Sequence, residues 1–540
     1  MKKISGIIVD PVARHQFPGT LVIDQGRIVE ILSDPGARGP FILPGLIDAH
    51  IHIESSMLTP AAFGAKAVCH GTVAVVADPH EIANVLGIAG IDFMIESGKQ
   101  VPLKFYFGAP SCVPATGFEN SGATLDARRV EALLTRDDIF FLAEIMNFPG
   151  VINQDPEVMA KLAAAAKLGK RVDGHAPGLR GESLVAYAQA GISTDHESGT
   201  LAECYEKLAL GMQIMLRQGS SARDFEVLHP LITSHFGQCM LCSDDLKPAD
   251  LVRGHINLLV KQGLSLGHDL FDLLQCACVN PVRHYGLKVG LLQKGDPADF
   301  IMVDDLARME VSGTWIGGEM VSDKGQPLFE VAQPKPINHF NAPLLMVEQL
   351  RVQARGSQIK VIEVTDGQIV TGCGFHSVPP GSTVVEADPA VDLLKILVQN
   401  RYTSAPPALG FVRGFGLKRG AMASSIAHDS HNLIVIGSND QDLARAVNLL
   451  GENGGGICFV CGAEERMMAL PVAGLMGLGS CEEMARDYSV IEQRVKENGS
   501  RLHTPFMTMA FLALPVIPSL KITDLGLFDG ERFALTDLFV

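Results

Sequence analysis

Two histidines stand one residue apart at the end of an apolar run near the start of the chain. The stretch LPGLIDAHIHIESS, residues 43–56, places His50 and His52 directly before a glutamate and two serines. Residues i and i+2 of a strand point to the same side, so the two imidazoles converge if the run is a strand. Two imidazoles aimed at one point are a typical start of a divalent-metal site. An ordinary turn that holds two histidines is the alternative, and the rest of the chain must decide.

Other residues that bind metals or transfer protons recur at the ends of later apolar runs. They are Asp78, His80 and Glu81, then Glu144, His175, His196 and Glu197, and last Asp244 and Asp245. Taken singly, His175 could be a structural histidine. Asp78 and Pro79 could serve merely to shape a turn. A contact to the substrate or to a ligating residue fits His80 better than a ligand role. Imidazoles and carboxylates together suit manganese, iron and zinc, so the full set predicts a metal site.

Eight short apolar runs carry these residues, and helical segments separate the runs. The runs cover residues 41–52, 71–81, 103–112, 139–148, 171–178, 191–198, 212–220 and 238–245. Segments such as 155–170 and 181–191 are rich in Ala, Leu, Lys and Glu, which favours helix. Eight strand–helix units predict an α/β fold, a (β/α)8 TIM-like barrel over residues 41–288, with its active site where the strands end. An open doubly wound sheet would show the same alternation, but eight units favour the closed barrel.

A barrel would bring the metal-type residues to one mouth, where they could hold two divalent ions. His50 and His52 would then bind one ion, and Asp244 would bind the same ion from across the barrel. The second ion would be held by His175 and His196. One carboxylate, Glu144, lies between these pairs in the strand order and would bridge the two ions.

The segments on either side of the barrel are rich in strands and require a different fold. Residues 1–40 contain the stretch GTLVIDQGRIVEIL (19–32), which predicts a hairpin with its turn at residues 24–26. Residues 289–332 are strand-rich as well. Neither segment is long enough for a core of its own, so we expect the two to form one small β-sandwich.

A Pro- and Asn-rich linker at residues 332–343 follows the sandwich. Beyond it, residues 338–540 mix strands and helices and predict a C-terminal α+β domain. Its glycine run NGGGI lacks the GxGxxG spacing and the lysine of phosphate-binding loops, which argues against nucleotide binding there.

Composition and charge limit the class of partner. The 540 residues are 47% hydrophobic and 19% charged, with a net charge of −16, which is typical of a compact globular protein. An acidic chain without a long basic run suits a neutral or cationic small molecule better than a nucleic acid. The N-terminus, MKKISGIIVDPV, is neither a secretory signal nor a membrane span. Eleven scattered cysteines indicate reduced thiols in the cytoplasm, and we expect a homo-oligomer, a dimer.

Longer stretches of the sequence resemble a known family. In the barrel region they are PGLIDAHIHIESSM, DPHEIANV, PSCVPATG, LAEIMNFPGVI, DGHAPGL, HES, GSSAR and MLCSDD; in the C-terminal region they are ASSIAHDSHNLIVIG, NGGGI, LPVAGLM and PFMTMAFLALPVIPSLKITD. The order of metal-type residues resembles that of the amidohydrolase superfamily, and the stretches resemble its adenine deaminase branch. The N-terminal arm is shorter than the family pattern. Many relatives bridge their metals with a carboxylated lysine on the fourth strand, but IFFLAEIMNF has no lysine, so Glu144 must take that role.

The resemblance implies the hydrolytic deamination of adenine to hypoxanthine and ammonia, a step of purine salvage, with two divalent metal ions. Manganese is the expected metal, with iron and zinc as alternatives. Asp244 is expected to move a proton from the attacking hydroxide to the leaving amino group, and Asp245 is the neighbour with which it could exchange roles. Glu54, Glu81 and Glu197 are candidates for protonating a purine ring nitrogen, or alternatively for orienting a neighbouring histidine.

The remaining candidates concern the purine pocket. Substrate contacts are expected from His80, Ser111, Cys112, Arg217 and Ser220, for which roles in surface loops are the alternative. The stretch SSIAHDSHN at 424–432 contributes His428, Asp429 and His431. This loop could be purely structural, could close the barrel mouth over the substrate, or could hold a separate metal ion.

Two other functions remain open from the sequence. A cyclic-amide hydrolase of the same superfamily would open a dihydropyrimidine or hydantoin ring, although the missing lysine of the fourth strand argues against it. A non-catalytic scaffold would keep the barrel and lose metal ligands, whereas every expected ligand is present here.

Overall fold

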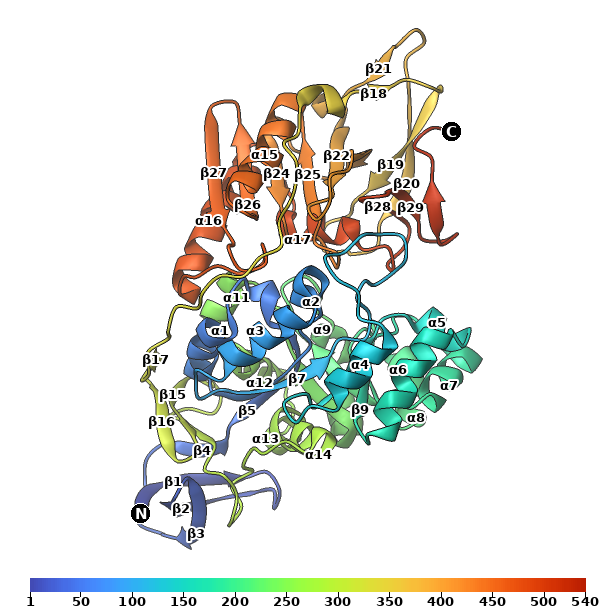
Figure 1. Ribbon diagram of the computed structural model, residues 1–540. Helices are drawn as coiled ribbons and strands as arrows, with labels where there is room; N and C mark the ends of the chain where they lie inside the picture. The colour runs from blue at the N-terminus through green and yellow to red at the C-terminus, as the bar shows by residue number, and fades with distance from the viewer. The chain divides into compact units, whose positions relative to one another are not determined.

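The structure, a computed structural model, describes residues 1–540 and divides into two compact units. Unit 1 comprises Met1–Pro79, Asp92–Ser111 and Asp126–Gln333. Unit 2 comprises His80–Ile91, Cys112–Leu125 and Pro334–Val540. Two short segments of the predicted barrel region, residues 80–91 and 112–125, therefore belong with the C-terminal part of the chain (Figure 1).

A curled parallel sheet forms the centre of unit 1. Its larger, six-stranded piece has the order β13-β5-β6-β7-β8-β9. These strands are β5 (Leu46–His52), β6 (Thr72–Ala77), β7 (Lys104–Ala109), β8 (Phe141–Ile145), β9 (Arg171–Gly174) and β13 (Asp244–Asp245). The smaller piece consists of β10 (Thr194–Asp195), β11 (Gln213–Arg217) and β12 (Cys239–Cys242). Every predicted apolar run thus contains a parallel strand.

The helices that follow these strands begin where the sequence provides caps and prolines. α6 (Pro156–Lys167) starts with a proline, and the side chain of Asp155 accepts hydrogen bonds from the main-chain amides of Glu157 and Val158. α7 (Gly181–Gln189) lies in the second predicted helical segment. Proline at the first helical position and an aspartate cap both favour helix initiation. Both helix predictions are confirmed.

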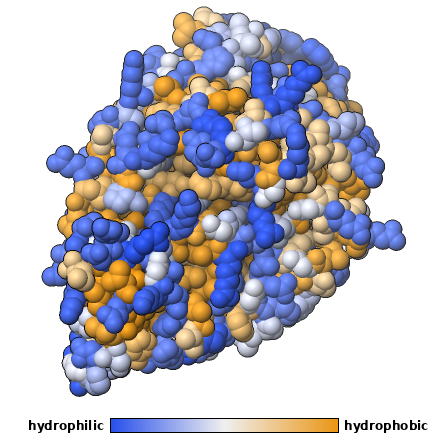
Figure 2. Space-filling view, turned by 60° about the horizontal axis from the view of Figure 1, so that its bottom comes forward, coloured by the Kyte–Doolittle hydropathy of each residue, from blue (hydrophilic) through white to orange (hydrophobic).

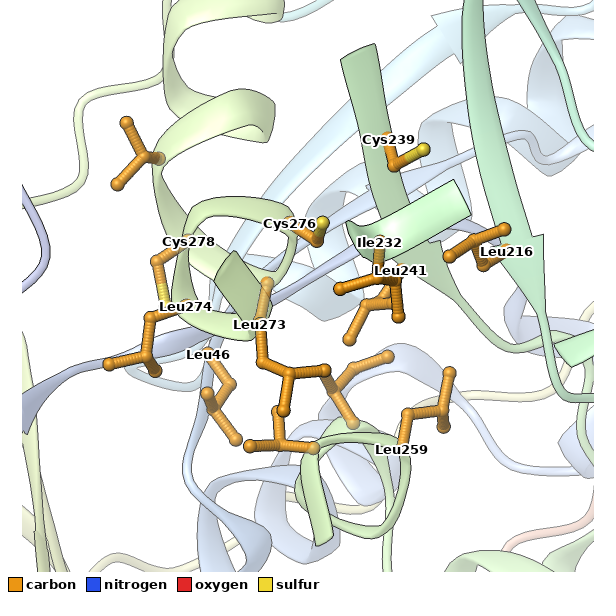
Figure 3. Packing of buried hydrophobic residues seen from close by; sticks show 14 of the residues in the cluster. Leu46, Leu216, Ile232, Cys239, Leu241, Leu259, Leu273, Leu274, Cys276 and Cys278 are labelled. Atoms are coloured by element: carbon orange, nitrogen blue, oxygen red, sulfur yellow. The ribbon is translucent and has the colours of Figure 1, made fainter. Parts of the chain in front are cut away.

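The core of unit 1 fills the space between strands β5, β11 and β12 and helices α10 (Pro230–His235), α12 (Ile256–Ser265) and α13 (Leu270–Leu274). Figure 3 shows Leu46, Leu216, Leu241, Leu273 and Cys276 as members of one buried cluster, with Leu216 next to Leu241. Burial raises the pKa of the Cys276 thiol well above its usual value. The CAC stretch therefore serves as small apolar packing, and all eleven cysteines are free thiols.

Strands from both sides of the barrel region join in one eight-stranded sheet, with the order β17-β16-β15-β14-β4-β1-β2-β3. Its strands are β1 (Lys2–Asp10), β2 (His15–Asp24), β3 (Arg27–Ser33), β4 (Phe41–Pro44), β14 (Phe300–Val303), β15 (Val311–Ile316), β16 (Glu319–Asp323) and β17 (Gln326–Pro327). The predicted hairpin is β2–β3. Its turn places Gln25 and Gly26 at φ values of 46° and 76°, a pair of left-handed residues typical of tight hairpins.

One apolar run behaves differently from its prediction. Residues 41–52 form two strands, β4 in the eight-stranded sheet and β5 in the parallel sheet. The chain divides at Gly45, where a Cβ atom would lie 2.3 Å from both methyl carbons of Val73. The hydrophobic run is continuous because both strands are buried, so periodicity alone could not reveal the break.

Unit 2 is built on a mixed sheet with the order β20-β19-β23-β22-β25-β24-β26-β27. The strands are β19 (Gln358–Glu363), β20 (Gly372–Ser377), β22 (Leu394–Gln399), β23 (Ala408–Arg413), β24 (Ala421–Ser424), β25 (Leu433–Gly437), β26 (Gly456–Cys461) and β27 (Glu464–Ala469). The helices α15 (Asp440–Glu452) and α16 (Cys481–Glu497) pack against its strands (Figure 1). Residues 328–346 contain no helix or strand, as expected for a linker.

Hydrophilic residues lie among hydrophobic ones on the face that Figure 2 shows. None of the helices combines the length and the apolar character needed to cross a bilayer.

Candidate active site

Six side chains predicted as metal ligands meet at the carboxyl ends of the parallel strands of unit 1. They are His50 and His52 of β5, Glu144 of β8, His175 directly after β9, His196 directly after β10, and Asp244 at the start of β13. Their exposed fractions range from 0% to 8%. Charged and titratable groups are rarely buried to this degree without a partner or a metal ion.

The first group of donor atoms centres on His50, His52 and Asp244. The Nε2 atoms of the two histidines lie 3.2 Å apart. Oδ1 of Asp244 lies 3.5 Å from Nε2 of His50 and 3.3 Å from Nε2 of His52. The H-x-H spacing therefore brings both imidazoles to one point. The carboxylate of Asp244 reaches the same point from β13, the strand that pairs with β5, and not from across the sheet as expected.

Glu144 lies between this group and a second one. Its Oε1 is 3.2 Å from Nε2 of His52. Its Oε2 is 2.7 Å from Nδ1 of His175 and 3.1 Å from Nε2 of His196. One carboxylate thus presents an oxygen to each group, which is the geometry of a bridging ligand.

These residues fit a divalent metal site. Ligands about 2.0–2.2 Å from one ion lie roughly 3.0–3.5 Å from each other, and the distances from His50 and His52 to Asp244 have that size. Nε2 of His196 is buried and lies 3.1 Å from Oε2 of Glu144 without the geometry of a hydrogen bond, a spacing that two ligands of one ion would also have. The mixture of imidazoles and carboxylates is the ligand type of manganese, iron and zinc.

Both carboxylates of the cluster are ionised. Burial alone would raise the pKa of Glu144, but His175 and His196 hold it well below its usual value. Burial would also raise the pKa of Asp244. His50, His52 and Arg217 lower it by more, so the pKa of Asp244 lies well below its usual value. Anionic ligands are therefore present before any cation binds.

Arg217 at the end of β11 was expected in the purine pocket, and the structure places its guanidinium among three carboxylates. Nη1 donates to Oδ2 of Asp244 at 2.9 Å and also to Glu197. Nε and Nη2 donate to Oδ2 of Asp224 at 3.0 and 2.7 Å. This arrangement turns Oδ1 of Asp244 toward the histidines. Asp224 was missed from the sequence because nothing in its surroundings marks it.

The other residues of unit 1 predicted for the site have the following places. Oγ of Ser55 donates to Asp245 at 2.5 Å, so the two adjacent aspartates have different partners. Glu54 is buried in the short helix directly after β5. The hydroxyl of Ser111 donates to the main-chain oxygen of Glu144. Ser220 donates to Asp250 at 2.7 Å and does not join the cluster.

Unit 2 contains a second buried cluster, formed by Glu81 and the loop after β24. Nδ1 of His428 lies 2.8 Å from Oε1 of Glu81, and Nε2 of His431 contacts Oε2 of the same carboxylate. His80 lies near it, with Nε2 3.6 Å from Oε1 of Glu81 and 3.9 Å from Oδ1 of Asp429. The predicted residues His80, Glu81, His428, Asp429 and His431 are therefore brought together.

Glu119 belongs to the same cluster and was missed from the sequence. Burial, together with the charge of Asp429, raises the pKa of Glu119 to about 8. The stretch PSCVPATG ends two residues before Glu119, which is the only nearby signal. Cys112, a predicted pocket residue in the same stretch, is buried in unit 2.

Comparison with known proteins identifies the family. Residues 41–321 match the amidohydrolase family, and residues 368–534 match the adenine deaminase C-terminal domain. The chain is 49% identical to an adenine deaminase of Methanosarcina acetivorans over 100% of both chains. It is 49% identical to one of Sulfurovum over 98% of both and 44% identical to one of Borreliella burgdorferi over 99% of both. The chain therefore belongs to the amidohydrolase family and, within it, to the adenine deaminases.

Proposed function

We propose that the protein is an adenine aminohydrolase that converts adenine and water to hypoxanthine and ammonia. The observation that carries the proposal is the buried set of four histidines and two carboxylates at the strand ends, in a chain whose full length matches adenine deaminases. An activated water molecule attacks C6 of the purine, and the amino group leaves with the proton that the water gives up.

The two pieces of the parallel sheet form one (β/α)8 barrel in this proposal. β12 and β13 are separated only by Ser243, and the main-chain amide of Ser193 donates to Val172 at 2.9 Å, which links the β10 side to β9. Residues 41–288 would be this barrel, with a β-sandwich from residues 1–40 and 289–332. The C-terminal domain would cover residues 338–540.

Two divalent cations, manganese in this proposal, would be held by the six side chains, with Glu144 shared between them. Such ions supply an activated water molecule, because they lower its pKa from 15.7 to about 7. Asp244 takes up the proton of the attacking water and delivers it to the leaving amino group. Arg217 keeps Asp244 in one orientation through the bond to Oδ2. Burial of the cluster keeps bulk water away from the reacting carbon.

Ammonia release and the ultraviolet change on incubation with adenine test the proposal directly. Adenosine, guanine and cytosine serve as substrate controls, and treatment with a chelator followed by manganese tests the metal requirement. Ring opening of dihydroorotate without ammonia release from adenine would favour the cyclic-amide hydrolase. A purified protein without bound metal and without either activity would indicate a scaffold.

A further inference from the structure

Lys207 is a lysine inside unit 1 with an exposed fraction of 0%. It lies in α8 (Leu201–Ala209), the helix that follows β10. Its Nζ lies within hydrogen-bond distance of four oxygens: Oδ2 of Asp195 at 2.8 Å, Oε1 of Glu203 at 2.7 Å, Oγ of Ser198 at 3.0 Å and the main-chain oxygen of Ala176 at 2.8 Å. A lysine is almost never fully buried unless it is paired, and here all its partners lie in unit 1.

Two of these four oxygens belong to direct neighbours of His175 and His196, the histidines of the second group of donor atoms. Ala176 follows His175, and Asp195 precedes His196. Successive side chains of an extended segment point to opposite sides, so Asp195 faces α8 while His196 faces the cluster. Lys207 therefore contacts both chain segments that carry these histidines.

Asp195 also joins the two segments directly. The main-chain amide of Ala176 donates to Oδ1 of Asp195 at 2.9 Å. The hydroxyl of Ser198 donates to Oδ2 at 2.6 Å, and Lys207 donates to the same oxygen. Both oxygens of Asp195 are thus engaged by protein donors, and this carboxylate connects the segments instead of binding an ion.

Glu203, one helical turn before Lys207, extends the network. Its Oε1 accepts from the main-chain amide of Gly178 at 2.8 Å, and its Oε2 accepts from that of Gly199 at 3.3 Å. Burial lowers the pKa of Lys207, but Asp195 and Glu203 raise it by more, to above its usual value. One charged ammonium group between two carboxylates therefore fixes residues 176–178 relative to residues 195–199.

We propose that Lys207 is a positioning residue for the second metal ion, because it holds the segments of His175 and His196 at the separation at which both imidazoles bind one cation. The inference rests on the proposed two-ion site. The two imidazole rings are 5.4 Å apart between centroids, at an angle of 77°, and both approach Oε2 of Glu144. The first group of donor atoms comes from β5 and β13, whereas the bonds of Lys207 go to α8 and to the segments after β9 and β10.

Lys207→Met tests the role, because methionine fills much of the same space without the ammonium group. Asp195 and Glu203 then repel each other, and the two segments lose their common donor. Loss of a residue that orients metal ligands typically lowers metal affinity ten- to a hundredfold. We expect the dissociation constant of the second manganese ion to rise by about this factor and that of the first ion to change little.

Titration of the metal-free protein with manganese, followed by the electron paramagnetic resonance signal of the free ion, measures both constants. Removal of a nearby positive charge would by itself favour a second cation. Weaker binding of the second ion therefore identifies positioning, and unchanged or tighter binding would overturn the inference.

Lys104→Met is the matched control. Lys104 begins β7, at the end of the parallel sheet opposite to the metal-type cluster, and its Nζ lies 2.5 Å from Oδ2 of the buried Asp299. Both variants remove an ammonium group from a buried carboxylate, so both should lower the unfolding temperature. Only Lys207→Met should weaken the second ion. Equal weakening in the two variants, or of both ions in Lys207→Met, would indicate a general loss of structure and overturn the inference.

Ser198→Ala keeps the inference testable if Lys207→Met does not fold. This change removes one acceptor from Lys207 and one donor from Asp195 with little change in volume. We expect the dissociation constant of the second ion to rise about threefold to tenfold, the size of the contribution of a typical hydrogen bond. An unchanged constant in this variant would overturn the inference.

The wild-type protein separates this inference from the proposed function. Wild type that binds two manganese ions and deaminates adenine, together with unchanged constants in Lys207→Met, would overturn only the role of Lys207. Wild type that binds fewer than two ions, or releases no ammonia from adenine, would overturn the proposed two-ion deaminase site and the inference with it.

Discussion

At the scale of single residues, the two adjacent aspartates after β12 offer the sharpest comparison. Asp244 faces His50 and His52, whereas Asp245 is bonded to Ser55. We expect Asp244→Asn to lower kcat for adenine by about 10²–10⁴, the usual effect of losing a general acid–base group, with some metal still bound. Asp245→Asn should have a much smaller effect. Steady-state kinetics with metal analysis measure both, and the opposite ranking would assign the proton transfer to Asp245.

The H-x-H pair provides a second comparison at this scale. His50→Ala or His52→Ala removes a nitrogen from the first group of donor atoms, so both variants should bind less metal and lose deamination. Elemental analysis of the purified variants and an ammonia assay check this expectation. His229→Ala, which changes a histidine paired with His268 away from the cluster, is the matched control. Full metal content with near-native turnover in either variant would contradict the metal site.

Glu119 allows a prediction about stability and pH. Its pKa is about 8 in the folded protein and 4.5 in the reference state, so between these values the folded state binds one more proton than the unfolded state. The stabilising contribution of its proton is fully present below pH 4.5 and is lost as the pH rises to about 8. Glu119→Gln cannot ionise, so its stability relative to wild type should increase over this range and remain constant above it. Denaturant unfolding at pH 5, 7 and 9 measures the difference, and a pH-independent difference would contradict the raised pKa.

At the scale of elements, most strands could be predicted from the sequence, and so could the meeting of the buried histidines and carboxylates at the strand ends, because each apolar run is followed by polar residues. The division of residues 41–52 could not, since Gly45 interrupts a run that is buried on both sides of the break. The network of Arg217 with Asp224 could not be predicted either, because an ion pair between the end of a strand and the irregular segment after it leaves no periodic pattern in the sequence. Loop 428–431 was marked by its residue types, but its partner Glu81 lies about 350 residues away and depends on tertiary structure.

The break at Gly45 gives a test of the element boundary. A Cβ atom on Gly45 would lie 2.3 Å from both methyl carbons of Val73, whereas one on Gly199 would have no atom within 4 Å. We expect Gly45→Ala to lower the free energy of unfolding by about 1–3 kcal/mol, the usual cost of overpacking a buried position. Gly199→Ala is the matched control and should change it little. Denaturant unfolding compares the two, and equal stabilities would contradict the close approach of β4–β5 to β6.

At the scale of the whole molecule, the chain passes between its two units several times. Segments 80–91 and 112–125 belong to unit 2, and within this unit Asn120 bonds to Asp524 through its amide at 2.9 Å and its side chain at 2.7 Å. A fragment that starts at the linker therefore lacks part of its own fold. We expect fragments 1–333 and 334–540 made separately to unfold at lower temperature than the full chain, and coexpression to restore stability. A fragment 334–540 as stable as the full chain would contradict this division.

The bond between Asn120 and Asp524 also has a consequence for synthesis on the ribosome. The two residues are 404 positions apart in the sequence. At a translation rate of about 5–20 residues per second, about 20–80 s pass between the synthesis of Asn120 and that of Asp524. The segments around Glu81 and Glu119 therefore leave the ribosome long before the strands that complete their unit. Glu81 is thus among the early residues to be made, and its imidazole partners His428 and His431 are translated only when most of the protein exists.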